Sequence, residues 1–176
     1  MIHYAQASTL NHLEQILELQ QQNLYKNLTA KEKELEGFLT VEHTLSILKE
    51  MNDACGHIIA LDNEKVVAYA LCMHPMFAES IEVLKPMFHE INKVVKDKGN
   101  YMVMGQICIA KSHRGRGIFR RLYKTMKEKL PPGFDTIITE VDTKNQRSVN
   151  AHKAVGFTEL KKYSSDGKDW LLISLS

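Results

Sequence analysis

The sequence predicts an α/β fold: a single domain with a mixed, mostly antiparallel sheet, one central parallel pair of strands, and helices on both faces. Three observations predict it. Apolar residues recur at helical spacing early in the chain. Two apolar runs rich in β-branched residues follow, separated by a short polar turn. Farther on, a strand, a basic loop, a helix and another strand succeed one another, and such a crossover joins parallel strands.

In the first part of the chain, a short strand is expected at residues 2–5. Ser8 or Thr9 can cap the helix that follows. Its apolar positions recur at helical spacing and are Leu10, Leu13, Ile16, Leu17 and Leu24. A second helix is expected after Thr40 and should end near Gly56. Its buried stripe is Leu45, Leu48 and Met51. Strands at 57–61 and 66–73 should form an antiparallel hairpin around the turn at 62–65.

The second part of the chain carries the crossover. Residues 79–98 look helical, with Pro86 as a break or kink and Gly99 as a stop. A strand at 102–110 leads into the basic loop, a helix at 118–130 follows, and Pro131-Pro132-Gly133 ends it. The remaining elements are expected as strands at 136–141, 157–163 and 170–175 and a helix at 148–155.

Length and composition fit one soluble globular domain over residues 1–176. The chain is 44% apolar and 25% charged, which is typical of such domains and not of disordered or membrane proteins. Its cysteines, Cys55, Cys72 and Cys108, show no CxxC spacing, so neither a disulfide framework nor a metal site is expected. No export or membrane-spanning segment is indicated, and a reducing cytoplasm is the expected location.

Charge is distributed unevenly along the chain. The net charge is only +2, but residues 111–127 hold seven Lys or Arg and no Asp or Glu. This excess favours an anionic ligand. A phosphate-binding loop between a strand and a helix needs glycine for close backbone approach, free N–H groups and the positive end of the helix dipole. Residues 114–119 can supply all three, although a solvated basic turn is the alternative interpretation.

Two motifs resemble those of the GNAT acetyltransferase superfamily. The run Arg114-Gly115-Arg116-Gly117-Ile118-Phe119 is similar to the family's Arg/Gln-x-x-Gly-x-Gly/Ala signature, from which Phe119 departs. Asn145 and Ser148, followed by His152 and Gly156-Phe157, resemble its second block, Asn-x-x-Ala/Ser with Tyr/His-x-x-x-Gly-Phe. The resemblance is strongest over residues 100–160. It implies a GNAT-like sheet and acetyl-CoA as co-substrate.

The same resemblance implies a cofactor site. The basic loop and the helix after it would hold the pyrophosphate of coenzyme A, and the strand before the loop would pair its backbone with the pantetheine arm. The residues implied are Ile107, Cys108, Ile109, Arg114, Gly115, Arg116, Gly117, Ile118, Phe119, Arg120, Asn145 and Ser148. For Asn145, a plain helix N-cap is equally consistent with the sequence.

Two residues are expected to move protons. His152 occupies the position where many relatives carry a tyrosine that protonates the leaving thiolate, so it is the predicted general acid. A hydrogen bond within the last helix is its alternative role. Glu140 is the predicted general base, with a salt-bridged or exposed carboxylate as the alternative. A covalent route through Cys108 can be written, but a small buried apolar residue is the favoured interpretation.

The implied function is transfer of the acetyl group of acetyl-CoA to a primary amine of an unidentified acceptor, which residues 25–43 and 74–79 would select. The expected partners are acetyl-CoA and the acceptor, without nucleic acid or membrane, and a homodimer is known among relatives. The alternatives are a non-catalytic coenzyme A sensor and a nucleic-acid-binding protein that uses the same basic loop. A P-loop hydrolase is excluded, because no Gly-x-x-x-x-Gly-Lys-Ser/Thr run exists.

Overall fold

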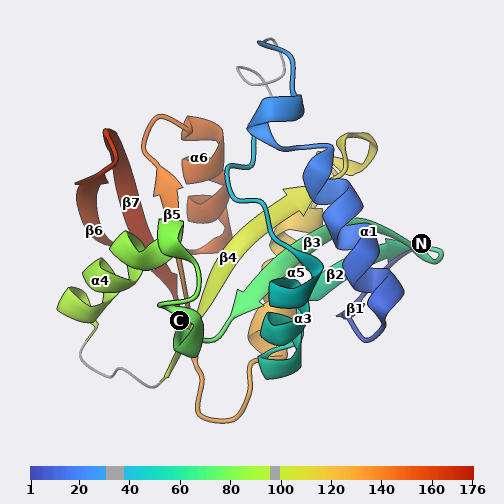
Figure 1. Cartoon of the computed structure of the whole chain (residues 1–176), viewed down its shortest axis with the longest axis horizontal. Coiled ribbons are helices and arrows are strands. Elements are labelled where there is room, and N and C mark those ends of the chain that lie inside the picture. Colours follow the sequence, from blue (N-terminus) through green and yellow to red (C-terminus); the bar gives the residue numbers. More distant parts are fainter. Residues whose placement is uncertain (31–37, 96–99) are drawn as a thin grey trace. The chain divides into compact units, whose positions relative to one another are not determined.

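The computed structural model describes residues 1–30, 38–95 and 100–176. Seven strands follow the order β1-β2-β3-β4-β5-β7-β6 (Figure 1). Strands β4 and β5 run parallel, and the β1–β2, β2–β3, β5–β7 and β6–β7 pairs are antiparallel. The predicted mixed, mostly antiparallel sheet with one parallel pair is therefore confirmed.

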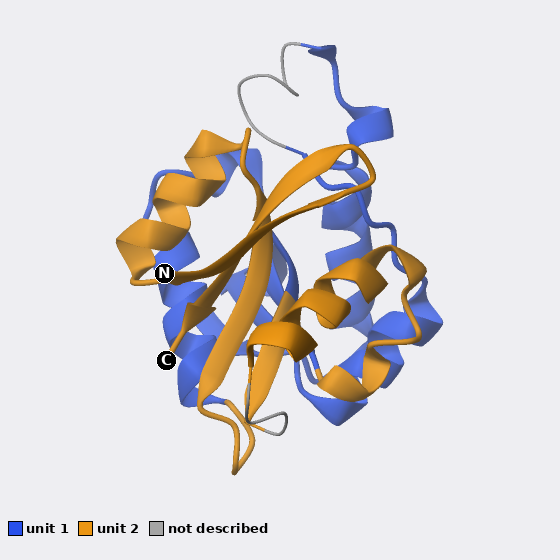
Figure 2. Ribbon diagram, turned by 90° about the vertical axis from the view of Figure 1, so that its left-hand side faces the viewer, with its two compact units in different colours: residues 1–73, 105–129 blue, residues 74–104, 130–176 orange. Residues whose placement is uncertain are grey.

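The chain divides into two compact units (Figure 2). Unit 1 comprises Met1–Met73 and Gly105–Lys129, and unit 2 comprises His74–Met104 and Leu130–Ser176. Strand β4 (Tyr101–Ile109) contributes its first residues to unit 2 and its last residues to unit 1. Each unit is described by itself below.

The described residues of unit 1 form three further strands and three α-helices. Its elements are β1 (Ile2–Gln6), α1 (Leu10–Gln21), the 3-10 helix η1 (Tyr25–Asn27), α3 (Leu45–Ala54), β2 (Ile58–Asp62), β3 (Lys65–Met73), the 3-10 helix η4 (Lys111–His113) and α5 (Ile118–Glu128). The predicted helices and strands of this region are present, but α1 ends at Gln21, before Leu24, which the sequence had assigned to its apolar stripe. Thr9, rather than Ser8, caps α1, because its Oγ1 accepts a hydrogen bond from the His12 N–H at 3.1 Å.

The core of unit 1 is built around β3, which is buried on both faces from Val66 to Met73. Helices α1 and α3 pack on each other and on one face of this strand, and α5 packs on the other (Figure 1). Strand β3 reads as a continuous apolar run for this reason: both faces are removed from water. The tight turn before it places Asn63 in the left-handed region, at φ 55°.

Unit 2 contains the remaining elements. They are the 3-10 helices η2 (Pro75–Phe77) and η3 (Glu82–Leu84), α4 (Lys85–Val94), β5 (Thr136–Asp142), α6 (Gln146–Val155), β6 (Thr158–Ser165) and β7 (Lys168–Leu175). The long helix predicted at 79–98 is shorter. Pro86 stands in its first turn, where a missing N–H costs nothing, so it starts the helix instead of kinking it. The predicted stop at Gly99 lies outside the described residues.

Helices α4 and α6 cover opposite faces of the unit 2 strands (Figure 2). Residues paired directly across antiparallel strands share a face, so Glu140, Leu172 and Lys161 point to one side. Lys161 contacts Glu90 of α4 on that side. A Cβ added to Gly156, which ends α6, would lie 3.6 Å from Leu175, on the other side.

Candidate functional site

The basic loop of unit 1 exposes the amino end of α5. Gly115 and Gly117 have φ of 74° and 75°, a region that favours glycine. Gly117 is the N-cap of α5 and makes no side-chain cap hydrogen bond, and no acidic residue stands in the first turn. The first N–H groups of a helix lack intrahelical acceptors and carry its positive dipole end. The loop therefore has the geometry of an anion site.

The Arg114 side chain is engaged within unit 1. Its Nε donates to the Ile109 carbonyl at 3.0 Å, and its Nη2 donates to Asn23 Oδ1 at 2.9 Å. These bonds attach the loop to β4 and to the end of α1, so Arg114 shapes the site. The bulky Phe119 packs edge-to-face on Tyr123, one helical turn on, with ring centroids 5.2 Å apart.

The last residues of β4 alternate between two environments. Cys108 is buried, whereas Ile107 and Ile109 on the opposite face are partly exposed. Burial raises the pKa of the Cys108 thiol to about 12, with the nearby Arg114 charge opposing the shift. A nucleophilic cysteine needs a lowered pKa, so this environment supports the interpretation of Cys108 as a buried apolar residue.

A buried polar network crosses unit 1 beside this strand. The Gln106 amide nitrogen donates to the Val41 carbonyl at 2.9 Å, and its oxygen accepts from the Tyr69 hydroxyl at 2.7 Å and from Gln20 at 2.8 Å. The Gln20 oxygen in turn accepts from the His43 backbone N–H. Because backbone groups fix both ends, the orientation of each amide is determined.

The network also fixes the state of His43. Gln20 Nε2 donates to His43 Nδ1 at 2.9 Å, so the neutral ring carries its proton on Nε2. Desolvation lowers the pKa of His43 to about 4, which keeps it neutral. Its Nε2 is buried without a hydrogen-bond partner among the described residues. Sequence analysis missed this network, because its members lie far apart in the chain and none belongs to a motif.

In unit 2, Glu140 is paired with Tyr163. The Tyr163 hydroxyl donates to Glu140 Oε2 across the intervening strand β7. Desolvation raises the pKa of Glu140 to about 7, and the hydrogen bond from Tyr163 opposes this rise. Burial and the neighbouring Glu140 charge raise the pKa of Tyr163 above its usual value. A carboxyl group that titrates near neutral pH can act as a general base.

A second carboxylate on this face has a different environment. Glu90 of α4 accepts from Lys161 at 2.5 Å and from Lys93 at 2.6 Å. These two ammonium groups lower the pKa of Glu90. Glu90 is therefore ionised and structural, whereas Glu140 has no such cationic partner among the residues that the structure describes. The different surroundings separate the two carboxylates chemically.

The His152 side chain forms a hydrogen bond within its own helix. Its Nδ1 donates to the Ser148 carbonyl at 2.8 Å, and its ring packs edge-to-face on Phe157 at 5.1 Å. Desolvation lowers the pKa of His152 to about 4. A general acid must hold its proton near neutral pH, so this direction does not favour the predicted acid role.

The second motif residues form the start of α6. Asn145 is the N-cap, and its Oδ1 accepts from the Ser148 N–H at 3.1 Å. This is the alternative that the sequence left open for Asn145. The structure does not bring His152 and Glu140 together: α6 covers one face of β5, and Glu140 points to the other. Tyr163, which does meet Glu140, was not predicted, because only the antiparallel pairing of β6 places it there.

Comparison with known families identifies the chain. A model of the acetyltransferase (GNAT) family matches residues 13–157. The protein therefore belongs to the GNAT acetyltransferase family, as the two motifs predicted. No curated protein sequence matches the chain.

Solved structures share its fold at low sequence identity. The NatC complex bound to Gag peptide and CoA contains a chain with a TM-score of 0.67 and 15% identity, covering 99% of this chain and 97% of its own. The Escherichia coli ribosomal-protein-S18-alanine N-acetyltransferase has a TM-score of 0.63 and 14% identity, and the match covers 99% of this chain and 93% of that one. Arabidopsis thaliana Naa50, in complex with a bisubstrate analogue, has a TM-score of 0.62 and 16% identity, and the match covers 99% of this chain and 98% of that one.

Neither a metal centre nor a membrane span emerges from the described parts of the chain. Within residues 1–30, 38–95 and 100–176, no three His, Cys, Asp or Glu side chains gather as metal ligands would. In the same ranges, no helix is both long and apolar enough to cross a bilayer.

Proposed function

We propose that the protein transfers the acetyl group of acetyl-CoA to a primary amine. The observation that carries the proposal is the amino end of α5, held open by Gly115 and Gly117 in a chain of the GNAT family. Bound acetyl-CoA supplies the acetyl thioester. The similar structures with CoA or a CoA-containing analogue support this choice of co-substrate.

In the proposed cofactor site, the backbone N–H groups of residues 115–120 bind the pyrophosphate. The exposed side chains of Arg116 and Arg120 add positive charge around it. The backbone of Ile107, Cys108 and Ile109 receives the pantetheine arm. Arg114 holds the loop in this conformation through its bonds to β4 and α1.

Glu140 is the proposed general base, which removes a proton from the attacking amine. Its partial burial and its pKa of about 7 support this role, because half of the carboxyl groups are then ionised near neutral pH. Tyr163 is its positioning residue. For His152 we propose a structural role within α6, and departure of the thiol then needs no proton from this ring.

The acceptor class to test first is a peptide α-amino group. Two of the similar structures hold a Gag peptide or a bisubstrate analogue containing MVNAL, which supports peptides over small amines as a first choice. Small primary amines and free amino acids form the second arm of the screen. Acetyl transfer to none of them, with acetyl-CoA bound, would favour a coenzyme A sensor.

Calorimetric titration of acetyl-CoA tests the cofactor site. Gly117→Asn and Gly117→Asp form a matched pair, because both residues tolerate positive φ and they differ in charge. A carboxylate roughly 8 Å from the phosphates weakens binding by about 2 kcal/mol at an effective dielectric of about 20. We therefore expect the Asp variant to bind about 30-fold more weakly than the Asn variant.

Gly133→Asp is the control for the introduced charge. Gly133 has φ 90° and open space around it, and the whole of α5 separates it from Gly117 along the chain. The Gly133→Asp variant should bind acetyl-CoA as tightly as the wild type does. Equal affinities of the two Gly117 variants would argue against pyrophosphate at this helix end, and no binding by the wild type would overturn the proposed cofactor.

A further inference from the structure

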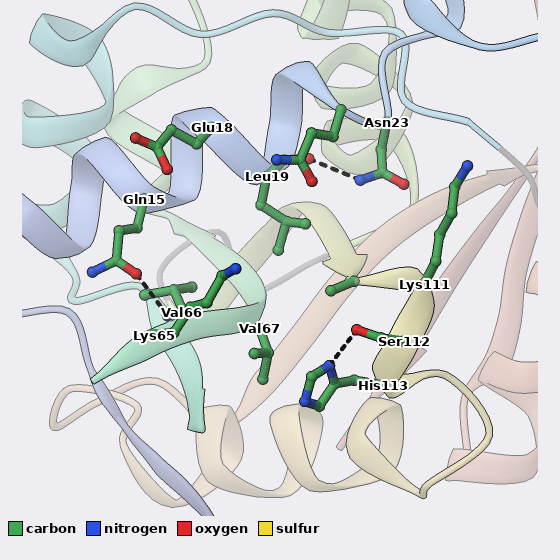
Figure 3. Close-up of a pocket in the computed structure, with 12 residues that line it drawn as sticks. Gln15, Glu18, Leu19, Asn23, Lys65, Val66, Val67, Lys111, Ser112 and His113 are labelled. Carbon is green, nitrogen blue, oxygen red and sulfur yellow. Dashed lines mark hydrogen bonds between the residues drawn. The ribbon is translucent and has the colours of Figure 1, made fainter. Parts of the chain in front are cut away.

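Unit 1 contains a pocket of about 410 Å³ that the proposed acetyl transfer does not use (Figure 3). It lies between α1, the start of β3 and the 3-10 helix η4. Leu19 and Val67 give it an apolar part, and Lys65, Lys111 and Ser112 also line it. A small pocket with both apolar surface and a few polar groups is typical of a ligand site.

A hydroxyl, an imidazole and a carboxylate are connected at one side of this pocket. Ser112 Oγ lies 2.8 Å from His113 Nδ1, and His113 Nε2 lies 3.2 Å from Asp62 Oδ2. A carboxylate can only accept, so the neutral ring carries its proton on Nε2. Nδ1 then accepts the proton of the Ser112 hydroxyl. This is the order of groups that activates serine nucleophiles.

Rigid backbone holds the three groups in place. Asp62 ends β2 and pairs with Lys65 across the hairpin. The Ala110 N–H donates to the Val67 carbonyl at 2.8 Å, and the His113 N–H donates to the Ala110 carbonyl at 2.9 Å. These bonds fix η4 beside β3. The His113 side chain is only 14% exposed, whereas Ser112 is exposed and open to a substrate.

We propose that Ser112 is a nucleophile that takes a short acyl group from an activated ester in this pocket. Ser112 Oγ bonds to the carbonyl carbon while its proton passes to His113 Nδ1. The bond from that carbon to the leaving oxygen breaks, and the leaving alcohol takes the proton from His113. Asp62 stabilises the transient imidazolium, and the ammonium group of Lys65, in the lining of the same pocket, favours the oxyanion.

The acyl-serine then reacts with water. His113 accepts a proton from the water molecule, whose oxygen attacks the acyl carbon, and the proton returns to Ser112 Oγ as the carboxylic acid departs. The net reaction is hydrolysis of the ester, with no oxidant or further reactant. It requires no coenzyme A, so it stands or falls independently of the proposed acetyl transfer.

The test uses the full chain and p-nitrophenyl acetate. We expect p-nitrophenol release and, after an acid quench, one acetyl group on Ser112 in peptide mass spectrometry. Ser112→Ala should lose this label, and Asp62→Asn should release p-nitrophenol at least about tenfold more slowly. Ser46→Ala, an exposed serine of α3 bonded to Glu50, is the control and should match the wild type.

Ser112→Cys separates a nucleophile from a merely structural residue. A thiol can take the acyl group, so this variant should be labelled at position 112, whereas a structural hydroxyl would make the Ala and Cys variants behave alike. Thermal melting of each variant shows that it is folded. Wild-type release rates in Ser112→Ala, or acetyl groups found only on lysines, would overturn the proposal.

Discussion

Replacing Tyr163 by Phe tests the proposed base directly. The change removes one hydroxyl and keeps the ring, so packing against neighbouring strands is preserved. The Tyr163 hydroxyl donates to ionised Glu140 and lowers its pKa, while desolvation has already raised that pKa to about 7. Without the donor, the ionised carboxylate is less stable and the pKa of Glu140 should rise further.

The magnitude follows from the strength of a hydrogen bond to a charged group. A contribution of about 1.5 kcal/mol corresponds to a rise of about one pH unit. At about pH 7 the ionised fraction of Glu140 then falls from about one half to about one tenth. We expect kcat/KM to fall about fivefold at that pH and to recover fully by about pH 9.

The assay is kcat/KM for acetyl transfer as a function of pH, measured with one acceptor for all variants so that the titration of the acceptor amine is common to them. Glu140→Gln should abolish the rise of kcat/KM with pH that reflects ionisation of Glu140, and should lower kcat/KM by about a hundredfold or more. An unchanged pH profile in Tyr163→Phe would refute the coupling of the two groups. A uniform loss at every pH would indicate a packing defect instead.

Three further predictions concern stability and the cysteine. Buried histidines have pKa values lowered to about 4: His43, His57 and His152. The unfolded chain binds these protons below about pH 6.5 and the folded chain only near pH 4, so stability is full above about pH 6.5 and lost on acidification. Glu140 partly offsets this, because its raised pKa favours the folded state at lower pH. Urea unfolding should show a net loss of about 3 kcal/mol between about pH 7 and pH 5, and a flat profile would contradict the buried neutral rings. Arg114→Ala removes two hydrogen bonds and should lower the free energy of unfolding by about 2 kcal/mol in the same assay; an unchanged midpoint would show that the loop is held otherwise. Cys108→Ala should retain kcat/KM within about threefold, whereas abolished activity would revive a covalent route.

Sequence reasoning could propose residues 114–119 as an anion site because the features that such a loop requires are local. A strand, two glycines with positive φ and a helix start all fall within a dozen residues, and each has a residue signature. Glu140 was predicted as the general base from its place on the strand that follows the loop and its helix. The acid role of His152 rested on its position in a motif, and burial within α6, which lowers its pKa, has no signature in that motif.

The groups that the sequence could not supply are those joined by long-range pairing. Tyr163 meets Glu140 only because β7 lies between β5 and β6 and brings position 163 to the same face. Asp62 and His113 are also distant in the chain, and only the β2–β3 hairpin beside η4 joins them. Sequence patterns indicate which residues share a face of one helix or strand. They do not indicate which helices and strands pack against each other.

The sequence by itself determined the order of helices and strands, the mixed sheet, the family and the loop proposed to bind acetyl-CoA, because hydrophobic periodicity and glycine positions act over a few residues. Only the tertiary structure decided which titratable groups are desolvated and which are paired. A pKa depends on the dielectric and the charges around a group, and those are set by the chain segments that fold against it.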